Sequence, residues 1–437
     1  MTNQIQFDAK VRPAIHAMRQ LFEENREGGL RGIYSVCSAN RLVLEAAFAQ
    51  ATNDESLLLI EATCNQVNQD GGYTGLTPVQ FRDYVLSLAG NAHFPEDRLV
   101  LGGDHLGPNP WRPAPAHEAM EKASVMIQDF ARAGFAKIHL DASMRCADDP
   151  DVLSDSVIAE RAAHLCELAE AVAAETSQSP VYIIGTEVPT PGGAQGELEV
   201  TVTSTQNVQR TLDVHHEAFV RRGLGSAWER VVGVVVQPGV EFGDESIADY
   251  EPQGAQRLSE WILGEERIIF EAHSTDYQTA QSLEQLVRGH FAILKVGPEL
   301  TFALREAIFG LARIEDEWIA DSKRSDVRGV LEREMIEHPE NWEGYYRGDP
   351  HHLKIARAYS LSDRIRYYWP NRAVSDALAV LTQNLLDHPA PLPLIAQYLP
   401  FEADAIRRNE IVNNPVAMIR HRVQRTLARY SRACGLA

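Results

Sequence analysis

The sequence predicts a closed (β/α)₈ barrel followed by a helical extension. Eight short apolar runs recur along the chain, and most of the gaps between them carry a helical pattern. The runs are continuously apolar rather than alternating, which is typical of parallel strands buried on both faces. They are similar in length and each ends in a polar residue, which favours a closed barrel over a doubly wound open sheet.

The elements follow in order along the chain. Apolar residues at helical spacing predict an opening helix over residues 8–25, which Gly28 and Gly29 end. The eight strands are predicted near residues 32–37, 57–63, 98–104, 137–143, 181–187, 231–237, 267–273 and 291–297. Helical patterns occupy residues 41–50, 77–89, 116–133, 156–176, 278–288 and 301–320. We therefore assign residues 1–325 to the barrel and residues 326–437 to the extension.

Length, composition and charge suit this architecture and restrict the partners. The 437 residues fit one barrel with an appendage, and 44% hydrophobic with 23% charged residues is ordinary globular composition. The net charge of −20 is spread along the chain, which argues against nucleic acid or an anionic membrane as a partner. The basic residues 420–429 are accordingly interpreted as a solvated or inter-subunit helix face.

Cysteine usage and hydropathy predict a cytoplasmic protein. The five cysteines are odd in number and show no C-x-x-C spacing, which indicates reduced thiols. No apolar run reaches the roughly 18 residues of a membrane span. The N-terminus lacks the charged-then-apolar pattern of a signal peptide.

Polar residues at the strand ends predict a site, because active sites of such barrels lie at the carboxyl ends of the strands. The third strand leads through two glycines into Asp104 and His105. The other strand ends supply Asp141, Ser143, Glu187, Gln237, His273 and Lys295. A single Asp or Ser after a strand is also a common helix cap. His139 lies inside an apolar run and is interpreted as a satisfied interior histidine.

Three of these residues are the predicted metal ligands. His105, His273 and Glu187 combine imidazole and carboxylate, which suits Zn²⁺ or Mn²⁺. Gln237 is a fourth weak ligand or a hydrogen-bond donor. Asp104 is assigned to proton transfer, and Glu187 is the alternative carboxylate for that role.

Hydroxyl-rich and glycine-rich loops late in the barrel predict a phosphate site. The candidates for binding substrate or phosphate are Asn65, Asp141, Ser143, Gln237, Ser274, Thr275, Lys295 and Gly297. The sequence contains no G-x-x-x-x-G-K-[ST] and no strand-linked G-x-G-x-x-G, which argues against a P-loop kinase and against a bound nicotinamide.

Long segments resemble the so-called non-catalytic subunit family of class II D-tagatose-1,6-bisphosphate aldolase, over nearly the whole chain. They are residues 35–38, 61–69, 101–109, 137–143, 185–189, 236–242, 271–278 and 359–370. The resemblance implies a TIM barrel, sugar-phosphate chemistry, tagatose or galactitol catabolism and a catalytic aldolase subunit as partner.

The chain resembles class II aldolases themselves more distantly. In those enzymes an Asp-His pair after the third strand supplies the base and a zinc ligand, which Asp104 and His105 match. Two further histidine ligands end strands six and seven, and here only His273 matches, since Gln237 stands at strand six. The Lys-x-Asn after strand eight reads Lys295-Val-Gly. These departures argue against ordinary aldolase turnover.

The resemblance leaves two main functions. Similar chains include metal-dependent epimerases that convert D-tagatose 6-phosphate to D-fructose 6-phosphate at C4, and we predict this activity. C4 is not α to the C2 carbonyl, so a retro-aldol cut of C3–C4 is the chemically accessible route. The alternative is a subunit that stabilises a catalytic aldolase, and a third reading is a sugar-phosphate sensor without catalysis. The metal, the number of phosphates and a homo-oligomeric state stay open.

Overall fold

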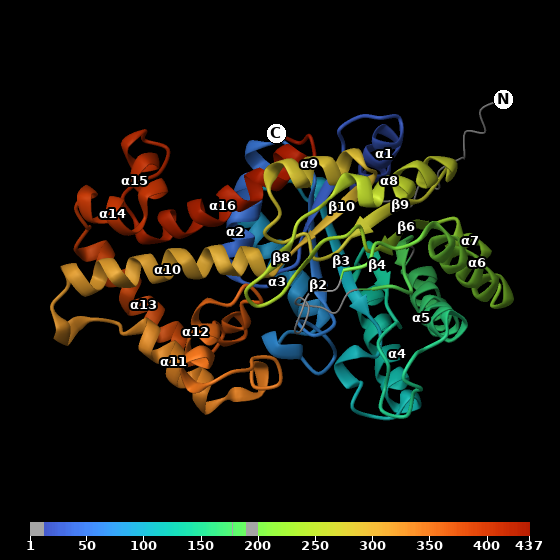
Figure 1. The fold of residues 1–437 in the computed structure, drawn as a ribbon, viewed down its shortest axis with the longest axis horizontal. Helices are drawn as coiled ribbons and strands as arrows, with labels where there is room; N and C mark the ends of the chain where they lie inside the picture. The colour runs from blue at the N-terminus through green and yellow to red at the C-terminus, as the bar shows by residue number, and fades with distance from the viewer. Residues whose placement is uncertain (1–12, 177, 189–199) are drawn as a thin grey trace.

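A closed barrel of eight parallel strands forms the centre of the computed structural model, which describes residues 13–176, 178–188 and 200–437 (Figure 1). The strand order around the barrel is β1-β10-β9-β6-β5-β4-β3-β2. The strands are β1 (Ile33–Val36), β2 (Leu58–Thr63), β3 (Leu99–Leu106), β4 (Lys137–Leu140), β5 (Val181–Ile184), β6 (Val231–Val236), β9 (Ile269–Ala272) and β10 (Phe291–Val296). The predicted (β/α)₈ barrel is therefore confirmed.

Helices cover the outside of this barrel. They are α2 (Arg41–Asn53), α3 (Pro78–Asn91), α4 (Ala116–Ala133), α5 (Asp155–Glu175), α6 (Thr205–Arg221), α7 (Gly225–Trp228), α8 (Pro252–Trp261) and α9 (Ala280–Arg288). A short antiparallel pair, β7 (Glu241–Phe242) and β8 (Ile247–Ala248), lies between β6 and α8. Among the described helices, none combines the length and the apolar character that a membrane crossing requires.

The opening helix closes the amino-terminal end of the barrel. It runs as α1 (Pro13–Arg26), and the first part of its predicted span lies outside the described residues. Its buried side chains, among them Ile15, Met18 and Phe22, form one apolar cluster with residues near the strand starts. This packing leaves the carboxyl end of the barrel as the place for a site.

Two long helices connect the barrel to the C-terminal extension. Helix α10 (Pro298–Trp318) leaves the barrel, and α16 (Pro415–Ala433) runs beside it and also packs on α2 and α9 (Figure 1). Between them lie α11 (Val327–Glu337), α12 (Pro350–Tyr359), α13 (Arg372–Asp387), α14 (Leu392–Tyr398) and α15 (Pro400–Arg407).

The basic stretch of residues 420–429 belongs to α16 and contacts the body of the molecule. Arg422 Nη2 lies 2.7 Å from Glu402 Oε2, and Arg429 pairs with Glu299 at the start of α10. Arg420 pairs with Glu45 of α2. Arg420 and Arg429 therefore connect the extension to helices of the barrel, and the Arg422 pair lies within the extension.

Candidate active site

A local irregularity of β3 directs two consecutive side chains into one cluster. In a regular strand, neighbouring side chains point to opposite faces. The pairing of β3 with β4 shifts between Gly103 and Leu106, and His105 has a φ of 50°. Such a bulge re-aims side chains. Asp104 and His105 are consequently both buried, 2% and 4% exposed, in the same cluster.

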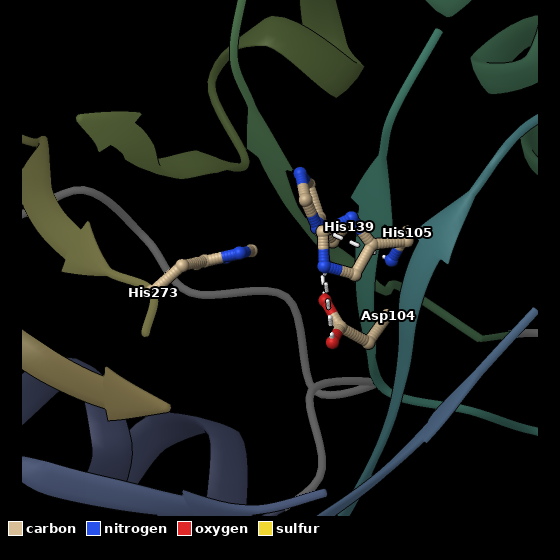
Figure 2. Close-up of side chains that lie close together, drawn as sticks. All are labelled: Asp104, His105, His139 and His273. Atoms are coloured by element: carbon tan, nitrogen blue, oxygen red, sulfur yellow. Dashed lines mark hydrogen bonds and ion pairs between the residues drawn. The ribbon is translucent and has the colours of Figure 1, made fainter. Parts of the chain in front are cut away.

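Three imidazoles converge beside Asp104 (Figure 2). His105, His139 and His273 come from β3, β4 and the end of β9. Their ring centres are 4.9 Å (His105–His273), 5.1 Å (His105–His139) and 5.2 Å (His139–His273) apart. Three imidazoles that share one tetrahedral zinc ion, each with a Zn–N distance of about 2.1 Å, have ring centres about 5 Å apart. The spacing therefore fits a single metal ion.

Each imidazole has one nitrogen bonded to a buried carboxylate. The pairs are His105 Nδ1 with Asp141 Oδ2 at 2.7 Å, His139 Nδ1 with Asp104 Oδ1 at 3.0 Å, and His273 Nε2 with Glu271 Oε1 at 2.9 Å. For His105 and His273 we assign the N–H to the nitrogen that faces the carboxylate, which leaves the other nitrogen as a lone-pair donor. His139 Nδ1 faces both Asp104 Oδ1 and the backbone N–H of His105, at 3.2 Å from the latter nitrogen, and the ring binds a metal through Nε2 only in the tautomer with its N–H on Nδ1. Metal-binding histidines are oriented in this way.

The Nε2 atom of His139 is the clearest sign of a ligand site. It is buried and has no hydrogen-bond partner in the described part of the chain. Buried polar atoms nearly always have a partner, so an orphan beside other ligand atoms fits an ion. The ligand atoms of Asp104, His105, His139 and His273 all lie within 4.8 Å of one another. The chemistry of this donor set suits a divalent cation.

His139 corrects the sequence-based interpretation. It is interior, as expected, but its second nitrogen is not satisfied by the protein. The strand pattern contains a signal for this inward-facing position. Lys137, His139 and Asp141 alternate with apolar residues, so a period of two places all three on one face. In a barrel strand with an apolar outer face, that polar face is the interior.

The structure does not bring Glu187 or Gln237 to the cluster. Strand β5 ends three residues before Glu187, whose exposed carboxylate accepts hydrogen bonds from Thr203 Oγ1 at 2.7 Å and Asn207 Nδ2 at 2.5 Å. Gln237 Oε1 accepts the backbone N–H groups of residues 239 and 240 at 2.8 and 2.9 Å and so closes a turn. The predicted ligand roles of both residues find no support in these placements.

Sequence reasoning missed a charged network beneath the cluster. Lys137 Nζ lies 2.7 Å from both Glu61 Oε1 and Glu271 Oε2. Lys295 Nζ contacts Glu61 and lies 2.9 Å from Asp104 Oδ1. All five side chains are buried in the barrel interior. A Cβ at position 102 would lie 2.5 Å from Glu61 Oε1, so the glycine there makes room for this carboxylate.

The surroundings of Asp104 and His273 favour an ionised carboxylate at the first and a neutral imidazole at the second. Burial alone would raise the pKa of Asp104, but the charges of His105 and Lys295 outweigh it and hold that pKa well below its usual range. Burial would lower the pKa of His105, but Asp104 and Asp141 in turn raise that pKa, so a metal ion at His105 would bind in place of a proton. Burial lowers the pKa of His273 to about 4. At neutral pH, Asp104 is therefore a carboxylate that can accept a proton, and His273 is in the uncharged form that binds metals.

A pocket lies directly over the cluster, and Asp104, His105 and His273 are among the residues that line it. Of the predicted binding residues, Asn65, Ser274, Lys295 and Gly297 also line it.

Asp141, Ser143 and Thr275 are not among the residues that line the pocket, but they hydrogen-bond to residues of the site. Asp141 Oδ1 accepts hydrogen bonds from the backbone N–H and the hydroxyl of Ser143, at 3.0 and 2.6 Å. Asp141 thereby holds His105 in place. Thr275 is buried, and its hydroxyl donates to the Lys295 carbonyl at 2.6 Å.

Fold and site together define a (β/α)₈ barrel with a candidate metal centre at the carboxyl ends of its strands. Residues 18–435 match the family model described as D-tagatose-1,6-bisphosphate aldolase subunit GatZ/KbaZ-like, and the chain belongs to this family.

One solved structure is similar over most of the chain. It is a probable tagatose 6 phosphate kinase from Sinorhizobium meliloti 1021, with 45% identity, a TM-score of 0.85, and coverage of 92% of this chain and 100% of that one. Two aldolase structures align more weakly. The YdjI aldolase from Escherichia coli K12 has 12% identity, a TM-score of 0.41, and coverage of 84% and 96%. Fructose-bisphosphate aldolase from Campylobacter jejuni has 11% identity, a TM-score of 0.44, and coverage of 88% of this chain and 92% of that one.

Proposed function

We propose that this chain is a metal-dependent 4-epimerase that interconverts D-tagatose 6-phosphate and D-fructose 6-phosphate. One observation carries the proposal. Three carboxylate-oriented imidazoles lie around an ionised Asp104, and Asp104, His105 and His273 line the pocket. A subunit that only stabilises a partner has no physical need for this arrangement, because burying so many polar groups costs stability.

The proposed metal ligands are His105, His139 and His273. Imidazole nitrogens suit Zn²⁺ and also Mn²⁺, as expected from the sequence. A divalent cation bound there would supply Lewis-acid polarisation of a substrate oxygen. Asp141, Asp104 and Glu271 orient the three rings through the hydrogen bonds described above.

Asp104 is the proposed proton acceptor. Its carboxylate is held by Lys295 Nζ and His139 Nδ1, and it lines the pocket. It takes the proton of the C4 hydroxyl while the C3–C4 bond breaks, which leaves a three-carbon aldehyde phosphate and a three-carbon enediolate. The aldehyde turns over and presents its other face. The C3–C4 bond then forms again, and Asp104 returns the proton to O4. No oxidant or reductant is consumed.

Incubation of the purified chain alone with D-tagatose 6-phosphate and Zn²⁺ or Mn²⁺ tests this proposal. D-Fructose 6-phosphate should form, and Asp104→Asn should lower kcat by roughly 10²- to 10⁴-fold because the proton acceptor is lost. Glu187→Gln is the matched control and should keep wild-type turnover. The absence of product from the metal-loaded wild-type chain would contradict the proposal.

A second function is favoured by the family description, which names an aldolase subunit. In that role the chain would stabilise a catalytic class II tagatose-bisphosphate aldolase. Mixing this chain with a catalytic class II tagatose-bisphosphate aldolase distinguishes the two functions. Co-elution and a higher cleavage rate of the partner, without epimerisation by this chain alone, would establish the subunit role instead.

A further inference from the structure

Among the described residues that line the pocket, Arg366 is a cation with no carboxylate at ion-pair distance. Lys295 and Arg366 are the lysine and arginine side chains among its described lining residues. Lys295 is paired with Glu61 and Asp104. No described carboxylate lies within ion-pair distance of Arg366. The acid of its own turn, Asp363, pairs instead with Arg305, whose Nε lies 2.8 Å from Asp363 Oδ1.

Arg366 belongs to the C-terminal extension rather than to the barrel. It lies in the 3₁₀ turn Arg364–Tyr368. Its guanidinium donates to the backbone carbonyls of Ser362 and Asp363 and, at 2.9 Å, to the hydroxyl of Tyr367. These partners are uncharged groups, so they fix the position of the guanidinium and leave its charge available for an anion.

Aromatic packing attaches this turn to the mouth of the barrel. The ring of Tyr367 meets the ring of Tyr73 edge-on, with centroids 4.7 Å apart and an interplanar angle of 87°. Tyr73 follows β2, and both rings line the pocket. Edge-to-face pairs of this kind are stabilising. The extension therefore forms part of the pocket wall.

At one of the predicted phosphate candidates, Gly297, the backbone N–H is already bonded within the chain. The N-terminus of a helix after a late barrel strand is a common anion site. Here Asp276 Oδ1 accepts the backbone N–H groups of Gly297 and Glu299 at 2.9 and 2.8 Å, at the start of α10. The Gly297 N–H is therefore used by a carboxylate of the chain itself, and a phosphate needs another partner in this pocket.

We propose that Arg366 binds the phosphate group of the substrate and so makes the pocket selective for phosphorylated sugars. The inference rests on the proposed function in taking a sugar phosphate as the ligand. The planar guanidinium matches two phosphate oxygens at once. The extension thus contributes a binding residue, and the barrel alone is an incomplete site.

Calorimetric titration of the full-length chain with inorganic phosphate and with D-fructose 6-phosphate tests this assignment without turnover. Arg366→Met should weaken both affinities roughly 10- to 100-fold, because a charge-assisted hydrogen-bond pair is lost. Arg366→Lys should fall between Met and wild type. Affinity for free D-fructose should stay unchanged in both variants. Arg347→Met is the matched control, since Arg347 also donates to backbone carbonyls of the extension but lies outside the pocket lining.

The outcomes separate this inference from the proposed function. Arg366-dependent binding of phosphate without any epimerisation would overturn the function and leave the inference standing. Epimerisation with an unchanged KM in Arg366→Met would overturn the inference alone. Wild-type affinities for phosphate and sugar phosphate in Arg366→Met would overturn it as well, and so would a wild-type chain that binds neither ligand. Thermal unfolding of each variant verifies that the extension stays folded.

Discussion

At the scale of single residues, the site is built from hydrogen-bonded pairs of an imidazole and a carboxylate rather than from isolated metal ligands. Asp104 illustrates this, because it receives the N–H of His139 and the ammonium of Lys295 on one carboxylate oxygen. Its second oxygen is left for other contacts. The same carboxylate orients one proposed ligand and is the proposed proton acceptor, so substitutions here affect two functions at once.

His139 provides the first test at this scale. His139→Ala should lose at least nine-tenths of the metal that the wild-type chain retains after dialysis, because one of three imidazole ligands is removed. Elemental analysis measures this directly. His164→Ala is the control, since His164 bonds to Ser124 outside the cluster. Full metal content in His139→Ala would remove this residue from the ligand set.

At the scale of elements, the sequence predicted the strands well and their ends less well. The fifth strand was predicted over residues 181–187, whereas the hydrogen-bonded strand β5 ends at Ile184. Beyond Ile184 the chain leaves the ladder, Gly185 is still buried, and Glu187 is exposed. The bulge in β3 was equally invisible, because it depends on the register with β4. Long-range pairing of this kind leaves no local pattern.

A buried histidine in helix α6 carries a prediction about pH. His215 is fully buried, its Nδ1 donates to the Thr211 carbonyl at 2.8 Å, and burial lowers its pKa to about 4. The unfolded chain takes up a proton near pH 6.5 while the folded chain does not. The free energy of unfolding therefore falls as pH drops from 6.5 to 4, by about 1.4 kcal/mol per unit.

Replacing this side chain should reduce the pH dependence. In His215→Leu, the difference in unfolding free energy between pH 7 and pH 5 should be about 2 kcal/mol smaller than in the wild type. Urea titrations at the two pH values measure it. The exposed His351, changed in the same way, serves as the control. An unaltered difference in His215→Leu would show that this imidazole does not titrate as described.

At the scale of the whole molecule, barrel and extension form one structural unit. Helix α16 packs on α2, α9 and α10, the hydroxyl of Tyr430 donates to the Thr275 carbonyl at 2.7 Å, and the Cys434 carbonyl accepts the N–H of Gly32 at 3.1 Å. All of these contacts cross the division at residue 325 that we expected from the change in sequence character. The change in composition did not reveal that the chain returns to the barrel.

Removal of α16 should therefore damage the barrel itself. A chain that ends at residue 410 exposes the apolar faces of α2, α9 and α10, and we expect it to aggregate or to bind a hydrophobic dye. Size-exclusion chromatography and dye fluorescence measure these effects. Leu427→Asp, which places a charge at a buried position of α16, should act in the same direction. A monodisperse shortened chain with wild-type thermal stability would contradict this view.

Because α1 closes the amino-terminal end of the barrel, substrate and product can enter and leave only at the carboxyl end. With that end of the barrel filled by Ile15, Met18 and Phe22, arrival and departure share the rim where Tyr73 and Tyr367 meet. Fragments produced by carbon–carbon cleavage would have to pass this rim to escape. Retention of the fragments at this rim favours recombination over loss, and the yield of escaped aldehyde would measure that retention.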